Sequence, residues 1–165
     1  MNTNPSASRR RLLLAIGMLP LAGFANPGAA GSGPGAAPIQ VQVWKEPTCG
    51  CCKDWVAHLE ANGFKVFVNM GGTDAARVRL GIPQSMASCH TALVGGYAIE
   101  GHVPAREIKR LLREKPVAIG LAAPGMPIGA PGMDTPDYGG KKNPYDVILI
   151  AKGGGGTVYQ SYKGS

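Results

Sequence analysis

Residues 39–63 read IQVQVWKEPTCGCCKDWVAHLEANG, and this stretch decides the fold. Apolar residues alternate with glutamine from Ile39 to Val43, which is the period of a half-buried strand. After Pro47, apolar side chains recur at helical spacing until the stop signal Asn62-Gly63. The stretch therefore predicts a strand followed by a helix. Three of the chain's four cysteines lie at the junction between them: Cys49, Cys51 and Cys52.

The rest of the chain supplies the other elements of an α/β fold. Strands are expected at 65–68, 91–94, 97–99, 145–151 and 157–162, and helices at 74–80 and between Pro104 and Pro116. Gly95-Gly96 joins two of these strands as a hairpin. Residues 116–144 are rich in glycine and proline and predict a long irregular loop. This order predicts a thioredoxin-like three-layer sandwich with a mixed central sheet.

The N-terminus has the features of a secretory signal peptide. Consecutive arginines precede an apolar run at residues 12–24, and small residues follow it. The run is too short to span a bilayer, so we expect no stable membrane span in the mature protein. We expect residues 1–25 to be cleaved, or cleavage as late as residue 30, after export to the periplasm by the Sec or twin-arginine route. Residues 26–38 then form a flexible linker to a folded domain at 39–165.

The charge of the chain gives little support to a nucleic-acid partner. The formal net charge is +7, and three of the positive charges are arginines of the expected signal peptide. Removal of that peptide leaves +4, spread over the mature chain. Because the protein is expected outside the cytoplasm, we expect it to bind no nucleic acid.

The cysteine cluster is the main candidate for chemistry. Cys49 and Cys52 form a C-x-x-C pair at a strand–helix junction, where thioredoxin-like redox proteins carry their dithiol. Amides at a helix start stabilise thiolates, which serve equally as nucleophiles and as metal ligands. Cys51 favours a metal, since a soft ion such as Cu(I) gains from every added thiolate. Adjacent Cys51 and Cys52 point in different directions on a helix, which suits a sulfur-bridged cluster of several Cu(I) ions better than one tetrahedral zinc ion.

Residues elsewhere in the chain are candidates to complete the site. Cys89 ends the loop that enters the third expected strand, and in thioredoxin-like folds this loop lies against the dithiol. The weaker candidates, as metal ligands or as their supports, are His90, Glu100, His102, Met126 and Met133. Glu100 and His102 would share one face of a strand, so that Glu100 could orient His102. The sequence Pro-Gly-Met occurs at 124–126 and again at 131–133, which places two thioethers in one loop.

These motifs resemble those of the CopG-like copper-resistance proteins. The matching stretches are Lys45–Trp55 around the cysteine cluster, Ser88–Ala92, Gly96–Pro104 and Gly120–Met133. The resemblance covers roughly residues 40–150, and Ala130 stands where serine is expected. It implies a thioredoxin-like fold in the periplasm of a Gram-negative bacterium. It also implies copper bound by Cys49, Cys51, Cys52 and Cys89, and a role in copper tolerance beside other periplasmic copper-handling proteins.

The resemblance leaves the chemistry open between holding copper and turning it over. Our first hypothesis is a copper-binding protein that sequesters or passes on Cu(I). The second is an enzyme, a thiol–disulfide or copper oxidoreductase in which Cys49 and Cys52 are the catalytic residues. A hybrid would couple copper binding to the redox state of the pair. A structural zinc domain is the third hypothesis, and the single C-x-x-C motif argues against it.

Overall fold

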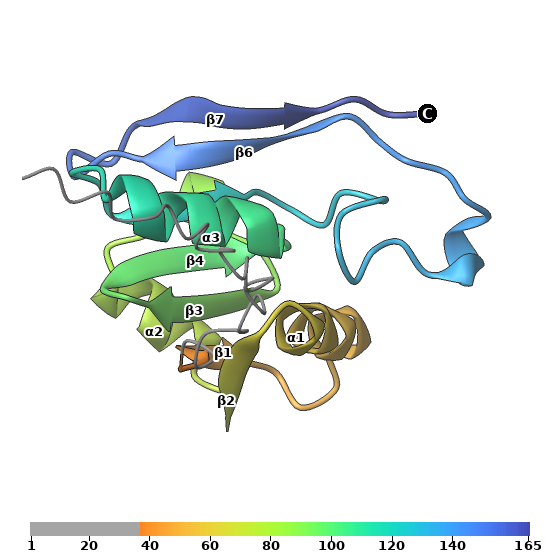
Figure 1. Ribbon diagram of the computed structural model, residues 1–165, viewed down its shortest axis with the longest axis horizontal. Coiled ribbons are helices and arrows are strands. Elements are labelled where there is room, and N and C mark those ends of the chain that lie inside the picture. Colours follow the sequence, from red (N-terminus) through yellow and green to blue (C-terminus); the bar gives the residue numbers. More distant parts are fainter. Residues whose placement is uncertain (1–36) are drawn as a thin grey trace, which may run out of the picture. The chain divides into compact units, whose positions relative to one another are not determined.

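The computed structural model describes residues 37–165, which form a mixed seven-stranded sheet with three α-helices (Figure 1). The strands lie in the order β2-β1-β3-β4-β5-β6-β7. Their bounds are β1 Ile39–Lys45, β2 Phe64–Met70, β3 His90–Val94, β4 Tyr97–Gly101, β5 Gly120–Ala123, β6 Tyr145–Ile150 and β7 Gly156–Tyr162. The helices are α1 Gly50–Ala61, α2 Thr73–Arg79 and α3 Ala105–Glu114, with short 3₁₀ helices η1 Gln84–Met86 and η2 Pro136–Tyr138.

The α/β class and the mixed sheet agree with the sequence analysis. β1 pairs with β2 in parallel and with β3 in antiparallel fashion, and β4 pairs with β5 in parallel. The expected hairpin is present, with β3 and β4 joined at Gly95-Gly96. The expected signal peptide and most of the linker, residues 26–38, lie outside the described residues. Within 37–165, no helix is long and apolar enough to cross a membrane.

The sequence analysis missed strand β5, which interrupts the segment expected to be an irregular loop. All four residues of Gly120–Ala123 are buried, so the strand has no polar alternation to reveal it. Its glycine reads as a loop residue, yet Gly120 is what allows β5 to approach β4. A Cβ atom at Gly120 would overlap the backbone carbonyl of Ala98.

The core lies on both faces of the sheet, and this explains how the helices are placed. On one face, Trp55 and Leu59 of α1 and Ile108 of α3 pack on the sheet in the main cluster. On the other face, a smaller cluster includes Ile82, from the segment between α2 and η1, and Ile150 of β6. The sheet therefore has helices α1 and α3 on one side and the α2–η1 segment on the other.

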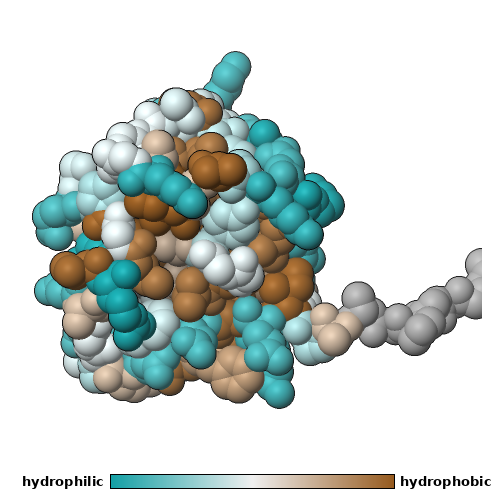
Figure 2. All heavy atoms as spheres, turned by 90° about the vertical axis from the view of Figure 1, so that its left-hand side faces the viewer, coloured by the Kyte–Doolittle hydropathy of each residue, from teal (hydrophilic) through white to brown (hydrophobic). Residues whose placement is uncertain are grey.

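The part of the surface at the left of Figure 1 is mixed in character. Figure 2 shows brown apolar side chains interspersed with teal hydrophilic ones over this face. The exposed apolar side chains of the described residues belong to several elements: Phe67, Val68, Met70, Val78, Val117, Met126 and Val158. Three of them, Phe67, Val68 and Met70, lie on the edge strand β2.

A histidine caps the start of α3 and gives the fold a pH-sensitive contact. The backbone N–H of Ala105 donates a hydrogen bond to Nε2 of His58, 3.1 Å away, at the end of α3 that lacks a side-chain cap of its own. Burial lowers the pKa of His58 below 6.5, and the charge of Asp134 partly opposes this shift. The unfolded chain therefore takes up the proton first. The stability that neutral His58 contributes is present above about pH 6.5 and is lost as the pH falls through the lowered pKa.

We expect His58→Gln to flatten the acid side of the stability profile, because glutamine keeps an acceptor but does not titrate. The free energy of unfolding of the unsubstituted protein should fall between about pH 7 and about pH 5 more steeply than that of the variant. Denaturant titrations of both proteins across this range measure the difference. Two parallel profiles would show that the cap at Ala105 contributes nothing that depends on protonation of His58.

Candidate metal centre

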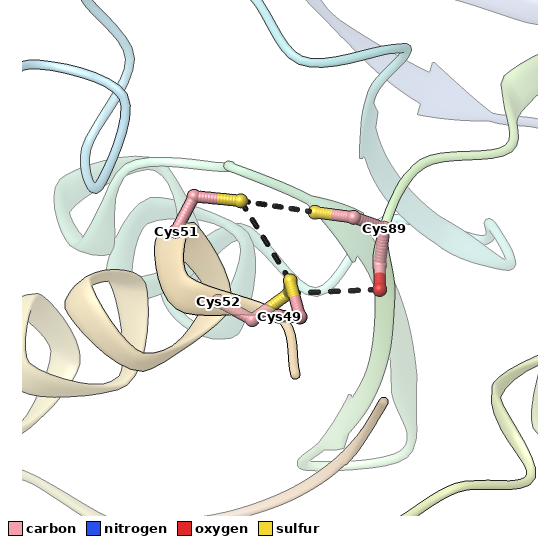
Figure 3. A group of neighbouring side chains, drawn as sticks. All are labelled: Cys49, Cys51, Cys52 and Cys89. Carbon is pink, nitrogen blue, oxygen red and sulfur yellow. Dashed lines mark hydrogen bonds between the residues drawn. A yellow bond between two sulfur atoms is a disulfide. The ribbon is translucent and has the colours of Figure 1, made fainter. Parts of the chain in front are cut away.

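Sheet pairing brings two distant segments together at one end of the fold. β1 and β3 are antiparallel neighbours, with Lys45 paired to His90. Cys89 therefore follows the end of β1 in space, and a short turn leads from Lys45 to the start of α1 at Gly50. The register of β1 and β3 thus places Cys89 beside the N-terminus of α1 (Figure 3).

The four cysteines meet at this point. Cys49 is the N-cap of α1, and Cys51 and Cys52 lie in its first turn. The Sγ atom of Cys51 lies 3.7 Å from that of Cys49 and 3.9 Å from that of Cys89. All four sulfur atoms lie within 4.8 Å of one another, and Figure 3 shows Cys51 and Cys89 pointing at each other. The structure thus brings together the four cysteines that the sequence analysis selected as the main candidates.

Two of these cysteines are oxidised. Cys49 and Cys52 form a disulfide, whereas Cys51 and Cys89 are free thiols and half-buried. A disulfide sulfur has no negative charge to donate to a metal ion, because the ligand form of cysteine is the thiolate. Four-thiolate coordination therefore requires reduction of the Cys49–Cys52 bond, in which two electrons convert the disulfide to two thiolates. The site has two redox states with different numbers of available ligands.

Two histidines extend the cluster on the side of Cys89. Sγ of Cys89 lies 3.1 Å from Nε2 of His102 and 3.4 Å from Nδ1 of His90. Nδ1 of His102 lies 2.8 Å from the carbonyl oxygen of Pro131, an arrangement in which the Nδ1–H donates. This contact leaves the Nε2 lone pair of His102 directed at Cys89. A histidine that ligates a metal is commonly held in this way through its second nitrogen.

Burial keeps the groups of this second cluster neutral. It lowers the pKa of His90 to about 3 and also lowers the pKa of His102. Burial, reinforced by the neighbouring thiol of Cys51, raises the pKa of Cys89 to about 12. Both imidazoles are therefore unprotonated at neutral pH and have free lone pairs. Cys89 retains its proton, which a metal ion must displace when it binds.

Glu100 is placed differently from the expected support of His102. Its carboxylate is fully buried and accepts hydrogen bonds from Arg77, Thr91 and the backbone N–H of Ser88. Burial raises the pKa of Glu100, and these three bonds oppose the shift. The partner of His102 is instead the carbonyl of Pro131. The alternating pattern of the sequence correctly placed Glu100 on a strand. It could not show that Arg77 of α2 and Ser88 of the loop before β3 are its hydrogen-bond partners.

The two Pro-Gly-Met sequences lie in different surroundings. Met133 is buried, with its sulfur 3.7 Å from the hydroxyl of Tyr138. Met126 is 55% exposed and lines a groove beside Tyr145 and Asp146 of β6. One thioether is therefore inside the fold, whereas the other lies at the surface.

The second of these sequences packs directly on the start of α1. A Cβ atom at Gly132 would lie 2.7 Å from both the carbonyl oxygen of Cys51 and the backbone nitrogen of Trp55. The adjacent Pro131 carbonyl holds His102. The loop that precedes η2 thus covers one side of the cysteine cluster, and only a glycine allows this approach.

One aromatic residue that sequence reasoning left in the core also belongs to the site. The ring of Trp55 packs against the ring of His90 at a tilt of 38°, with a centroid distance of 4.2 Å, and His90 meets His102 edge to face at 4.9 Å. Nε1 of Trp55 donates to the carbonyl oxygen of Val103. Helical spacing identified Trp55 as a buried residue, but its contact with His90 depends on tertiary structure.

The fold and the site define an α/β protein with a cysteine-rich candidate metal centre, and comparison with known proteins assigns its family. A family model described as a protein of unknown function, DUF411, matches residues 86–133. Two solved structures titled copper resistance protein copG, form 1 and form 2, each share 44% sequence identity with the chain. Each aligns with a TM-score of 0.70 over 76% of this chain and 98% of that chain. No curated protein matches the chain.

The chain belongs to the CopG copper-resistance family. Its relatives bear a copper-resistance name, and its cysteines lie close enough to hold a metal ion. A copper-related role follows from these two findings together.

Proposed function

We propose that this protein binds Cu(I) in a thiolate site formed by Cys49, Cys51, Cys52 and Cys89. The observation that carries the proposal is the placement of four sulfur atoms within 4.8 Å of one another at a helix start. Thiolates are soft ligands that favour Cu(I), and the helix dipole favours their negative charge. The copper-resistance name of the relatives supports copper over zinc.

The site is proposed to hold several copper ions. Cys51 lies between Cys49 and Cys89, with its sulfur 3.7 Å and 3.9 Å from theirs, so one thiolate can bridge ions held by its neighbours. His102, through Nε2, and His90, through Nδ1, offer further ligands beside Cys89. Their lone pairs are free because burial suppresses protonation of both rings. Met126 and Met133 remain weaker candidates, as in the sequence analysis.

A second function is favoured by the disulfide. A C-x-x-C pair that is oxidised beside two free thiols is the arrangement expected of a thiol–disulfide or copper oxidoreductase that uses Cys49 and Cys52. Copper binding and redox state are then coupled, since reduction of the disulfide supplies two of the four thiolates. In the direction of reduction, two electrons and two protons convert the bond to two thiols.

The setting proposed for this function is the periplasm. The arginines and apolar run at the N-terminus support export by a cleavable signal peptide, through the Sec or twin-arginine route. A thioredoxin-like fold is supported by the C-x-x-C pair at the strand–helix junction and by helices on both faces of a mixed sheet. The partners proposed are copper ions and other copper-handling proteins of the same compartment, with no nucleic acid.

Copper content and thiol count, measured together, test the proposal. We expect reduced protein loaded with Cu(I) to hold more than one copper per chain and to show no reactive thiols. Stripping the metal under anaerobic conditions should release four thiols, and air oxidation should then leave the two of Cys51 and Cys89. Elemental analysis and a thiol reagent provide both numbers. Absence of copper, with the disulfide re-forming on every oxidation, would favour the oxidoreductase.

A further inference from the structure

A buried ion pair contacts Ser88, the residue before Cys89, and takes no part in the proposed metal coordination. Arg77 of α2 and Glu100 of β4 are 5% and 0% exposed, and Nε of Arg77 donates to Oε1 of Glu100 at 2.9 Å. Glu100 accepts three hydrogen bonds, through Oε1 from Arg77 and Ser88 and through Oε2 from Thr91. Because both carboxylate oxygens have protein donors, Glu100 has a structural task here and is a poor candidate for a metal ligand.

The ion pair holds the residue before Cys89 from both sides. The backbone N–H of Ser88 donates to Oε1 of Glu100 at 2.7 Å, and Nη2 of Arg77 donates to the carbonyl oxygen of Ser88 at 2.8 Å. That carbonyl belongs to the peptide bond that joins Ser88 to Cys89. The hydroxyl of Thr91, two residues after Cys89, donates to Oε2 of Glu100 at 2.6 Å. The pair therefore fixes the chain immediately before and after the cysteine.

The segment that leads into Cys89 is not held in a helix or strand. Residues 87–89 lie between η1 and β3 and belong to no helix or strand. The Ser88 side chain packs so closely on Gly101 that a Cβ atom there would overlap it, and Ser88 Oγ donates to the carbonyl oxygen of Gly125. The segment has no ladder of backbone hydrogen bonds. Besides the ion pair and these two contacts, it is held at Ala87, whose N–H donates to the carbonyl of Gln84 and whose carbonyl accepts from the N–H of Gly125.

The energetics of buried ion pairs also indicate that this pair fixes a position more than it stabilises the fold. Removing two charges from water is costly, and apolar residues of similar size often give equal or greater stability. A pair whose hydrogen bonds converge on one peptide unit instead provides geometry, because a guanidinium presents several donors in a rigid plane. Arg77 meets Glu100 and the Ser88 carbonyl in this way at the same time.

We propose that Arg77 and Glu100 are positioning residues that hold the Cys89 thiol opposite Cys51, ready to share copper with the helix-start cysteines. This inference rests on the proposed copper-binding function. The distance it maintains is the 3.9 Å between the sulfurs of Cys51 and Cys89. Without the pair, the segment before β3 loses its hydrogen bonds to Arg77 and Glu100, and the position of Cys89 relative to α1 becomes less fixed.

The test uses the apolar double variant Arg77→Met/Glu100→Leu, with Asp74→Asn as its matched control. Asp74 also pairs with Arg77, but it lies on the exposed side and has no contact with Ser88. We expect the double variant to fold but to lose some stability, because the Ser88 backbone and the Thr91 hydroxyl lose their partners, and to bind Cu(I) at least tenfold more weakly. The control should match the unsubstituted protein in both measurements.

A readout independent of copper separates this inference from the proposed function. In the disulfide form only Cys51 and Cys89 have free thiols, so a fluorogenic bifunctional thiol reagent reports how often they face each other. We expect cross-linking to be at least tenfold slower in the double variant and unchanged in Asp74→Asn. If the unsubstituted protein binds no copper, the proposed function fails, while slower cross-linking still supports the positioning role.

A second variant keeps the inference open to refutation if the double variant does not fold. Arg77→Lys keeps the positive charge beside Glu100 but cannot also donate to the Ser88 carbonyl with the same planar group. We expect slower cross-linking and weaker copper binding in this variant too. Cross-linking and copper affinity that match the unsubstituted protein, in a folded variant lacking these contacts, would overturn the inference.

Discussion

Cys51→Ser is expected to lower the number of copper ions bound per chain while leaving the fold intact. Cys51 is half-buried, and its sulfur contacts two other sulfurs rather than the main core, so serine should cost little stability. The expected decrease in bound copper is large, because the thiolate between Cys49 and Cys89 disappears and a hydroxyl is a poor ligand for Cu(I). Elemental analysis beside thermal unfolding measures both quantities.

Cys52→Ser is the informative comparison for that experiment. Cys52 is fully buried, so a serine there would bury a hydroxyl in an apolar position, and the replacement should reduce copper content and stability together. A drop in copper content with an unchanged unfolding midpoint is expected for Cys51→Ser alone. Copper content equal to that of the unsubstituted protein would refute a bridging role for Cys51.

Gly132→Ala is expected to speed the loss of copper at least tenfold. A Cβ atom at this position would lie 2.7 Å from the backbone of α1 at Cys51 and at Trp55, so the covering loop must move away. The movement would also release the Pro131 carbonyl from His102. The rate of Cu(I) transfer to a competing chelator, followed by absorbance after mixing, measures the effect.

A glycine further along the same loop provides a matched control. Gly139, at the end of η2, has φ = +60° and Gly132 has φ = +81°, so alanine is strained at both by about 1–2 kcal/mol. A Cβ atom at Gly132 would meet the backbone of α1, whereas no atom lies within 4 Å of that position at Gly139. Gly139→Ala should therefore lose some stability and release copper at the normal rate. Equal release from both variants would mean that the loop does not cover the site.

Local patterns in the sequence predicted most of the elements, whereas close backbone contacts concealed the rest. The strand at Ile39 and the helix after Pro47 follow from periodicity, and the structure contains both. β5 was missed because Gly120, which resembles a loop residue, is required for its contact with β4. A glycine placed for close approach and a glycine placed for a turn look the same in one sequence.

The candidate site was predictable to the extent that its residues are chemically distinctive. Cysteines draw attention wherever they occur, and the loop position of Cys89 suggested its place beside α1. Arg77 and Ser88 carry no such signal, since their importance comes from contacts between α2, β4 and the loop before β3. The carbonyl of Pro131 is a backbone atom, and no side-chain pattern can indicate which carbonyl a histidine will meet.

The Cys49–Cys52 bond spans a sequence separation of only three residues, and this affects how the fold responds to reduction. A bridge that closes so short a loop removes little freedom from the unfolded chain, so it adds little to stability. The main core of α1, α3 and the sheet does not depend on it. We therefore expect one molecule to be reduced and re-oxidised repeatedly without unfolding.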